Sequence, residues 1–395
     1  MNRPALTVLG ASTFCYVTAE TIPVGLLPQI ASGLAVDEAA VGLLLTSYAV
    51  VAGVSTIPLT ALTMRVPRHL LIAIAMAIFA VSQAAASFAP TFAILVAARL
   101  ICALAHGVFW SVIGPVGARL APPGQAGKAT ALIFVGNSLA IVLGVPLGTA
   151  LGQWLGWRAA FGVLAVGGML CVLALARVLP SLPPDRVSRV ADDLRAAFTI
   201  VRNRRVMTLC AITTIIVVGQ FAAYTYIAPL VRRDGGLSGF GLSALLLGYG
   251  AAGLISNYLV GGLVDRRPGP VLTGLLAVMT VSVALLAPAL GLVPTVIVTL
   301  LWGAAFTAIP VCLAAGPLRV APRNQDAAMA VYVVAFQIGI GGGAFIGERF
   351  VSAGWLGALP VLAAVMALIS CLLVASARQV FPVDDHVRAE PQRTW

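Results

Sequence analysis

Three ionisable side chains stand inside long apolar stretches of the sequence, where a charge is costly. Glu20 lies near the middle of the first stretch, His106 near the middle of the fourth, and Arg99 seven residues before His106. Seven residues make about two helical turns, so Arg99 and His106 share one helix face. A buried carboxyl group beside a fixed cation can change its protonation state when its surroundings change. We therefore expect Glu20, Arg99 and His106 to take part in proton handling.

A structural interpretation of the same residues stays open at this point. In it, Glu20 and Arg99 form a buried ion pair that fixes the register of two helices. His106, one turn from Trp110, is then a hydrogen-bonded packing residue.

Uncharged polar side chains form a second set of candidates within the apolar stretches. Their amides and hydroxyls suit a hydroxyl-rich or amphipathic ligand. Hydrogen bonding between helices explains any single one of them equally well. The candidate substrate-binding residues are Asn137, Gln220, Tyr224, Asn257, Tyr332 and Gln337.

The composition indicates the environment of these residues. Hydrophobic residues make up 60% of the 395 and charged residues 9%, against roughly 25% charged residues in a soluble domain. So few charges cannot cover a surface that faces water, so the outer surface must face lipid. The six cysteines all fall in apolar stretches without a CxxC pair, and no metal or cofactor is expected.

Twelve apolar runs account for most of the chain, and most of them reach the roughly 20 residues that cross a bilayer. We therefore predict an all-α membrane protein with twelve transmembrane helices. The runs are residues 5–33, 39–64, 70–89, 91–118, 126–152, 157–179, 206–231, 240–264, 270–290, 294–318, 326–351 and 355–377.

A proline- and arginine-rich stretch, residues 180–205, divides the runs into two sets of six. We interpret it as a cytoplasmic linker between an N-terminal bundle (1–179) and a C-terminal bundle (206–377), with a cytoplasmic tail at 378–395. Matches about 200 residues apart support a parallel repeat of the two bundles. They include Pro28 with Pro229, Tyr48 with Tyr249, Arg65 with Arg266, and Arg119 with Arg319.

The basic residues predict the orientation. The formal net charge is +11, yet the basic residues cluster between apolar runs, which argues against a nucleic-acid partner. With the N-terminus inside, all but five of the 24 fall on the cytoplasmic side; the exceptions are Arg99, Arg158, Arg232, Arg233 and Arg349. We expect both termini in the cytoplasm of a bacterial inner membrane.

Two motifs resemble those of the major facilitator superfamily. Gly261-x-Leu-x-Asp265-Arg266 is similar to its GxLaDR signature. An N-terminal copy is degenerate, with Thr60, Leu62, Met64, Arg65 and Arg68 in those places and Met64 where the acid usually stands. The run Gly144-Val-Pro146-Leu-Gly148 resembles the antiporter motif of the twelve-span drug:proton antiporter family. Close helix packing through small residues explains the second motif too. We expect these residues to act in conformational change.

Two further segments, 20–28 and 98–111, resemble the bacterial sugar-efflux and arabinose-efflux branch. The resemblance implies the major facilitator fold and proton-coupled efflux of a small solute, a sugar or a drug, by alternating access. A uniporter or importer with Glu20 and Arg99 as a structural pair is the alternative. A monomer in contact with substrate, protons and lipids is expected.

Other classes of protein fit less well. Gly124-x-x-Gly127-Lys128 does not have the spacing of a nucleotide-binding loop. The apolar stretches lack a set of catalytic residues, so an enzyme is not expected. A single charged site argues against a channel with a ring of equivalent groups.

Overall fold

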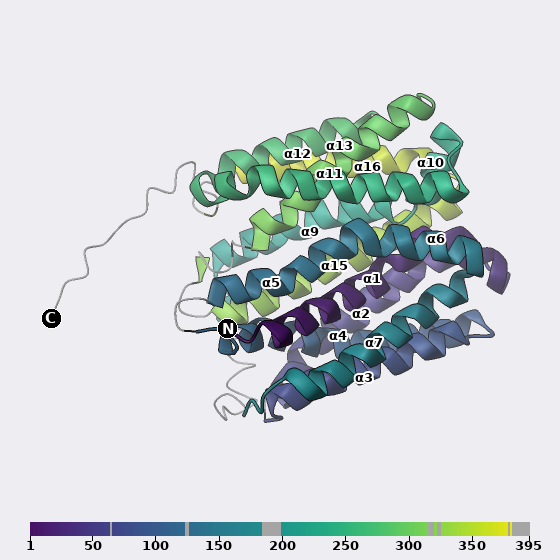
Figure 1. Ribbon diagram of the computed structural model, residues 1–395. Coiled ribbons are helices and arrows are strands. Elements are labelled where there is room, and N and C mark those ends of the chain that lie inside the picture. The colour runs from purple at the N-terminus through teal and green to yellow at the C-terminus, as the bar shows by residue number, and fades with distance from the viewer. Residues whose placement is uncertain are drawn as a thin grey trace.

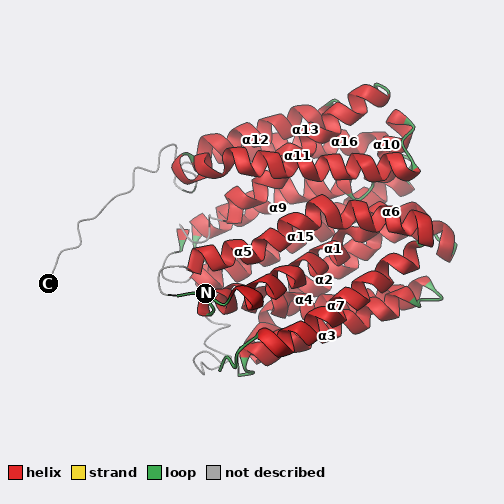
Figure 2. Ribbon diagram, in the orientation of Figure 1, coloured by secondary structure: helices red, strands yellow, loops and turns green. Residues whose placement is uncertain are grey.

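The computed structural model describes residues 1–63, 65–122, 126–183, 199–314 and 325–377, with the single positions 316, 320, 321 and 380. Within that part of the chain all regular structure is helical, and no strand is present (Figure 2). The fold is therefore that of an all-α membrane protein.

The helices of the first half of the chain are long and mostly continuous. They are α1 (Arg3–Leu34), α2 (Glu38–Thr63), α3 (Arg68–Ser87), α4 (Phe92–Arg119), α5 (Ala126–Leu139), the π-helical segment η1 (Ala140–Gly144), α6 (Val145–Leu155) and α7 (Trp157–Val178).

The second half follows the same plan. It contains α9 (Arg204–Tyr224), α10 (Ile227–Gly235), α11 (Gly239–Arg266), α12 (Pro268–Ala284), α13 (Leu292–Ala314), α15 (Gln325–Ser352), the short 3₁₀ turn η2 (Leu356–Ala358) and α16 (Leu359–Ser376).

Eleven stretches of the described residues are long and apolar enough to cross a membrane. The ninth predicted run, 270–290, forms only the 17-residue helix α12, because the chain leaves the helix after Ala284. The ninth predicted span therefore corresponds to a shorter apolar helix than the other eleven.

Two other predicted runs are interrupted. The run 126–152 consists of α5, η1 and α6, and the backbone N–H of Val145 bonds to the carbonyl of Ala140, five residues earlier. Pro146 follows directly and has no N–H to donate, which favours such a local widening of the helix. The run 206–231 breaks at residues 225–226 into α9 and α10.

The helices lie side by side in one bundle (Figure 1). α3 packs on α4 and α7 along one flank, and α12 packs on α13 and α16 along the other. Between the flanks, α15 contacts both α9 and α2, while η1 and α6 contact α11. The contacts of α15 with α2, and of η1 and α6 with α11, join helices of the first half of the chain to helices of the second.

The predicted division into two bundles and a tail stays a prediction. Most of the linker, residues 184–198, and the tail apart from residue 380 lie outside the described residues.

Candidate functional site

Arg99 is fully buried in α4, and its guanidinium binds the backbone of α1. Nη1 donates to the carbonyl oxygen of Ala19 at 2.5 Å and Nη2 to that of Glu20 at 3.2 Å. The reason lies in Pro23, inside α1. Proline has no N–H, so the carbonyl four residues earlier, that of Ala19, loses its helical partner. Arg99 supplies the missing donor within a membrane-spanning helix.

The side chains of Glu20 and Arg99 do not form the ion pair considered from the sequence. The ion pairs among the described residues instead lie elsewhere, and Glu348 with Arg349 (3.3 Å) is one of them. The guanidinium of Arg99 also lies over the ring of Tyr48, 4.6 Å from its centroid. Backbone carbonyls and a ring face thus surround this cation, and the Glu20 carboxylate keeps another partner.

That partner is Gln337, which α15 brings in from the second half of the chain. Its Nε2 lies 3.3 Å from Oε1 of Glu20 and 3.0 Å from Nε2 of His106. The side chain is only 4% exposed, and its Oε1 has no hydrogen-bond partner. One amide therefore joins α1, α4 and α15, and leaves a buried acceptor unused.

The hydrogens of this cluster can be assigned by counting donors. An amide NH₂ only donates, so His106 Nε2 must accept from Gln337. The imidazole proton then sits on Nδ1, which lies 3.0 Å from the hydroxyl of Tyr48. That hydroxyl in turn lies 3.7 Å from Sγ of Cys102. His106 is neutral in this arrangement.

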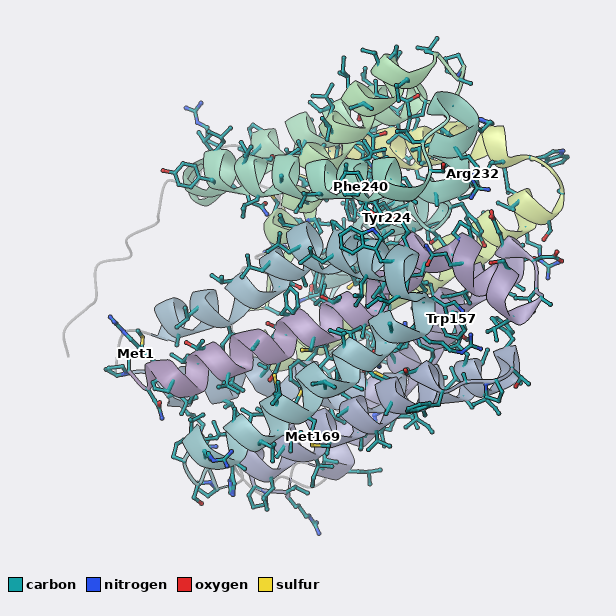
Figure 3. All side chains as sticks on the ribbon, turned by 45° about the vertical axis from the view of Figure 1, so that its right-hand side comes forward. Met1, Trp157, Met169, Tyr224, Arg232 and Phe240 are labelled. Carbon is teal, nitrogen blue, oxygen red and sulfur yellow. The ribbon has the colours of Figure 1, made fainter. Side chains whose placement is uncertain are left out.

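A second polar cluster lies between α9, α11 and α13. Trp302 Nε1 donates to Oε1 of Gln220 at 2.6 Å, and Gln220 Nε2 donates to the hydroxyl of Tyr249 at 3.0 Å. Tyr224 packs on Tyr249 and Trp302 with ring centroids 5.2 and 6.0 Å away, and Figure 3 shows it in the middle of the bundle. Gln220 therefore already has protein partners on both ends of its amide.

The other three polar candidates are dispersed. Asn137 is half-buried on α5, and Asn257 is half-buried on α11 with a buried Oδ1 that has no hydrogen-bond partner. Tyr332 is buried on α15, next to the ring of Phe336. Of the six candidates, Gln337 alone hydrogen-bonds to Glu20 or His106 among the described side chains.

The antiporter-like motif lies where η1 and α6 pack against α1. A Cβ on Gly144 would collide with the Thr18 side chain, and one on Gly148 with Ile22. Pro146 is buried at the start of α6. Both glycines thus permit a contact that larger residues would prevent.

The signature-like motifs are only partly described. Arg68 is buried at the start of α3 and its backbone N–H donates to the carbonyl of Leu182, whereas Arg65 is exposed just after α2. Gly261, Asp265 and Arg266 belong to the last turns of α11, but their side chains lie outside the described residues.

Tyr48 is the site residue that the sequence did not single out. It contacts Arg99, His106 and Cys102 at once. In the sequence, Tyr48 is the one tyrosine of its apolar run, and Tyr249 matches it in the repeat.

Contacts between the two halves also close the end of the bundle opposite the N-terminus, where α6 and α10 lie (Figure 1). Glu38 at the start of α2 pairs with Arg232 of α10 at 3.4 Å. The Tyr226 hydroxyl donates to the carbonyl of Ala39 at 3.3 Å, and Gln153 Nε2 donates to that of Gly239 at 2.8 Å. Figure 3 shows Arg232 toward this end. These contacts thus separate the Glu20–His106–Gln337 cluster from the end of the bundle where α6 and α10 lie.

Among the described residues, no group of His, Cys, Asp and Glu side chains is arranged to hold a metal ion.

Comparisons with known proteins agree on one family. The sequence profile of the Major Facilitator Superfamily matches residues 9–344. Chloramphenicol efflux pumps from two strains of Mycobacterium tuberculosis are 40% identical over 353 residues, which cover 87% of this chain and 84% of theirs.

Solved structures show the same fold at low sequence identity. A transporter of the POT family in complex with 5-aminolevulinic acid superposes with a TM-score of 0.78 at 10% identity, covering 96% of each chain. The nucleoside transporter NupG gives 0.75 at 14% identity, covering 95% of this chain and 99% of its own. The human organic anion transporter MFSD10 gives 0.71 at 16%, covering 94% and 99%.

Proposed function

Because the chain belongs to the Major Facilitator Superfamily, and is therefore a transporter and not an enzyme, we propose that it exports small, uncharged amphiphilic drugs such as chloramphenicol in exchange for protons. The drug class is favoured over a sugar by the relatives that are named as chloramphenicol efflux pumps. The aromatic rings and single amides around the site also suit an apolar body with a few polar groups.

One observation carries the proposal of proton coupling. The Gln337 amide donates to a carboxylate and to a neutral imidazole that belong to the other half of the chain. A proton added at Nε2 of His106 would face the amide hydrogens and break this contact. The amide must then rotate to offer its unused Oε1, which also ends its bond to Glu20.

Proton uptake at this cluster would thus loosen a contact between helices that have to move apart. A proton on Glu20 acts in the same direction, because a neutral carboxyl group is a weaker acceptor than a carboxylate. Alternating access requires such a link between the ligand state of the midplane and the packing of the two halves. In this proposal Glu20 and His106 exchange the proton, Gln337 transmits the change, and Arg99 holds the backbone of α1.

The test is accumulation of radiolabelled chloramphenicol in proteoliposomes with an acidic lumen. The parent should concentrate the drug, and a protonophore should abolish the gain. Glu20→Gln keeps shape and hydrogen bonding but cannot titrate, so it should lose gradient-driven accumulation and retain counterflow. Glu348→Gln makes the same change in a carboxylate that already pairs with Arg349, and should transport as the parent does.

Two results would contradict this proposal. A parent that never concentrates chloramphenicol would refute the drug assignment. A Glu20→Gln protein that accumulates the drug like the parent at every pH would remove Glu20 from the coupling mechanism.

A further inference from the structure

A groove of about 340 Å³ lies between α2 and α15, lined by Val50, Gly53 and Val54 on α2 and by Gln337, Ile338 and Gly341 on α15, among others. Both helices belong to stretches that can cross a membrane. The side chains on its rim, Val50, Val54 and Ile338, are 55%, 74% and 57% exposed. Since an exposed apolar side chain at this depth faces acyl chains, the groove opens sideways into the bilayer.

The groove exists because glycines on both helices leave its space unfilled by side chains. Gly53 is buried, and a Cβ added to it would reach within 3.6 Å of Cβ of Gln337, an ordinary contact distance. A Cβ on Gly341 would come within 3.0 Å of the Ala49 side chain. The two helices therefore approach closely at some levels, and the missing side chains leave space at others.

Gln337 is the polar residue of this otherwise apolar lining. It is the same side chain that binds Glu20 and His106, and its buried Oε1 has no hydrogen-bond partner. A buried acceptor without a partner is unfavourable, so a ligand that donates a hydrogen bond there gains affinity. An acyl chain cannot supply this donor.

We infer that the groove is a lateral binding site through which an uncharged, bilayer-dissolved amphiphile with a hydroxyl or N–H donor reaches the Glu20–His106–Gln337 cluster. The apolar body of the ligand lies along Val50, Val54 and Ile338, and a rotation of the buried Gln337 amide brings its Oε1 to the donor of the ligand. The volume is at the lower end of the roughly 300–1,000 Å³ typical of small-molecule sites. This inference rests on the proposed function for the identity of the ligand, and adds the route and the polar anchor.

The experiment uses reconstituted full-length protein and a photoreactive chloramphenicol in which an azide replaces the nitro group. Cross-linked peptides are mapped by mass spectrometry, and binding of unmodified chloramphenicol is measured in parallel. In the parent, the label should fall within residues 49–54 or 334–342, and chloramphenicol should compete for it.

Gly53→Leu should fill the groove and weaken both binding and labelling at least five-fold. Gly274→Leu is the matched control, because it adds the same side chain to an exposed glycine of α12 whose Cβ position has no atom within 4 Å. It should behave as the parent. If Gly53→Leu does not fold, Ile338→Trp obstructs the rim by changing only an exposed side chain.

The outcomes separate this inference from the proposed function. Binding at the parental level in Gly53→Leu and Ile338→Trp, or a label confined to other helices, refutes the assignment of the groove as a binding site. So does a photoreactive phospholipid that labels the groove and is not displaced by chloramphenicol, since the occupant is then lipid. A parent that is labelled in the groove but does not accumulate the drug refutes the proposed function alone. A parent that neither binds nor accumulates chloramphenicol refutes both.

Discussion

At the scale of single residues, the buried position of Arg99 follows from the proline at position 23 of α1. The proline removes a backbone donor from α1 inside the membrane, and the guanidinium of α4 replaces it at the carbonyl of Ala19. A cation is expensive at this depth, but here it is surrounded by carbonyls and the ring of Tyr48. Its first role is therefore to hold the backbone next to Glu20 in place.

This pairing predicts a rescue. Arg99→Met should lower the thermal stability of the purified protein by the equivalent of about 1–3 kcal/mol, the cost of a buried acceptor without a donor. Adding Pro23→Ala restores the N–H for the Ala19 carbonyl, so the double variant should recover a measurable part of the loss in a thermal-shift assay. An equally unstable double variant would show that Arg99 stabilises something other than this carbonyl.

Gln337 is the residue on which the proposed coupling depends. Gln337→Met keeps a long side chain but removes the donor to Glu20 and His106. A hydrogen bond to a charged group contributes about 1.5–3 kcal/mol, so proton-driven accumulation should fall about ten-fold or more.

The control for Gln337→Met is Phe345→Met, a half-exposed position further along α15, which should accumulate the drug like the parent. Counterflow measured in the same vesicles reports solute exchange without a proton gradient. If Gln337→Met keeps full accumulation, the amide does not transmit the protonation state.

At the scale of helices, the close approach of η1 and α6 to α1 depends on glycines. The π-helical turn before Pro146 places Gly144 against Thr18, with no room for a Cβ. The same segment contacts α11 of the second half. It therefore lies between α1, which carries Glu20, and the opposite half of the molecule.

Gly144→Val should push η1 away from α1 and destabilise the protein by about 1–3 kcal/mol, as overpacking does. Transport should fall even at temperatures where the variant is folded, because α1 can no longer pack as in the parent. Leu147→Val is the control on the same turn, with a side chain that is 60% exposed. Equal thermal stability and transport in the two variants would contradict a packing role for Gly144.

At the scale of the whole molecule, the described residues join the two halves at the Glu20–His106–Gln337 cluster and at the end opposite the N-terminus. The Glu38–Arg232 pair and two side-chain bonds to backbone carbonyls, from Tyr226 and Gln153, close that end. The basic-residue distribution predicts that this end is periplasmic. In this predicted orientation, the end that these contacts close faces the periplasm.

Arg232→Gln should open this end more often. An exposed ion pair contributes about 0.2–1 kcal/mol, which corresponds to an increase of up to about five-fold in the open population. The readout is the rate at which Gln29→Cys, in the cavity beside Arg232, reacts with an impermeant maleimide added to intact cells.

Trp154→Cys, at a position that is 73% exposed, gives the rate for an accessible thiol in the same assay. An unchanged rate at Gln29→Cys in the Arg232→Gln background would show that the pair does not hold the end closed. A thiol at position 154 that reacts only in everted vesicles would reverse the predicted orientation.

The sequence by itself determined the class, the family and most helix positions. Solvation is additive along the chain, so 60% hydrophobic and 9% charged residues already require lipid around the helices. The motifs around Gly144 and Gly261 correctly predicted the superfamily, and the runs located the long helices to within a few residues. The early end of α12 and the helix break after Tyr224 were not predicted, because local hydrophobicity does not indicate where packing against neighbouring helices ends a helix.

Only the tertiary structure decided the partners inside the site. Gln337 and Glu20 are 317 residues apart, and nothing local in either helix fixes which face meets the other. The sequence therefore ranked Gln337 with five other polar residues, and paired Glu20 with Arg99 on charge alone. Packing decided otherwise, since the carbonyl freed by Pro23 occupies Arg99, and the rotation of α15 brings an amide to the carboxylate.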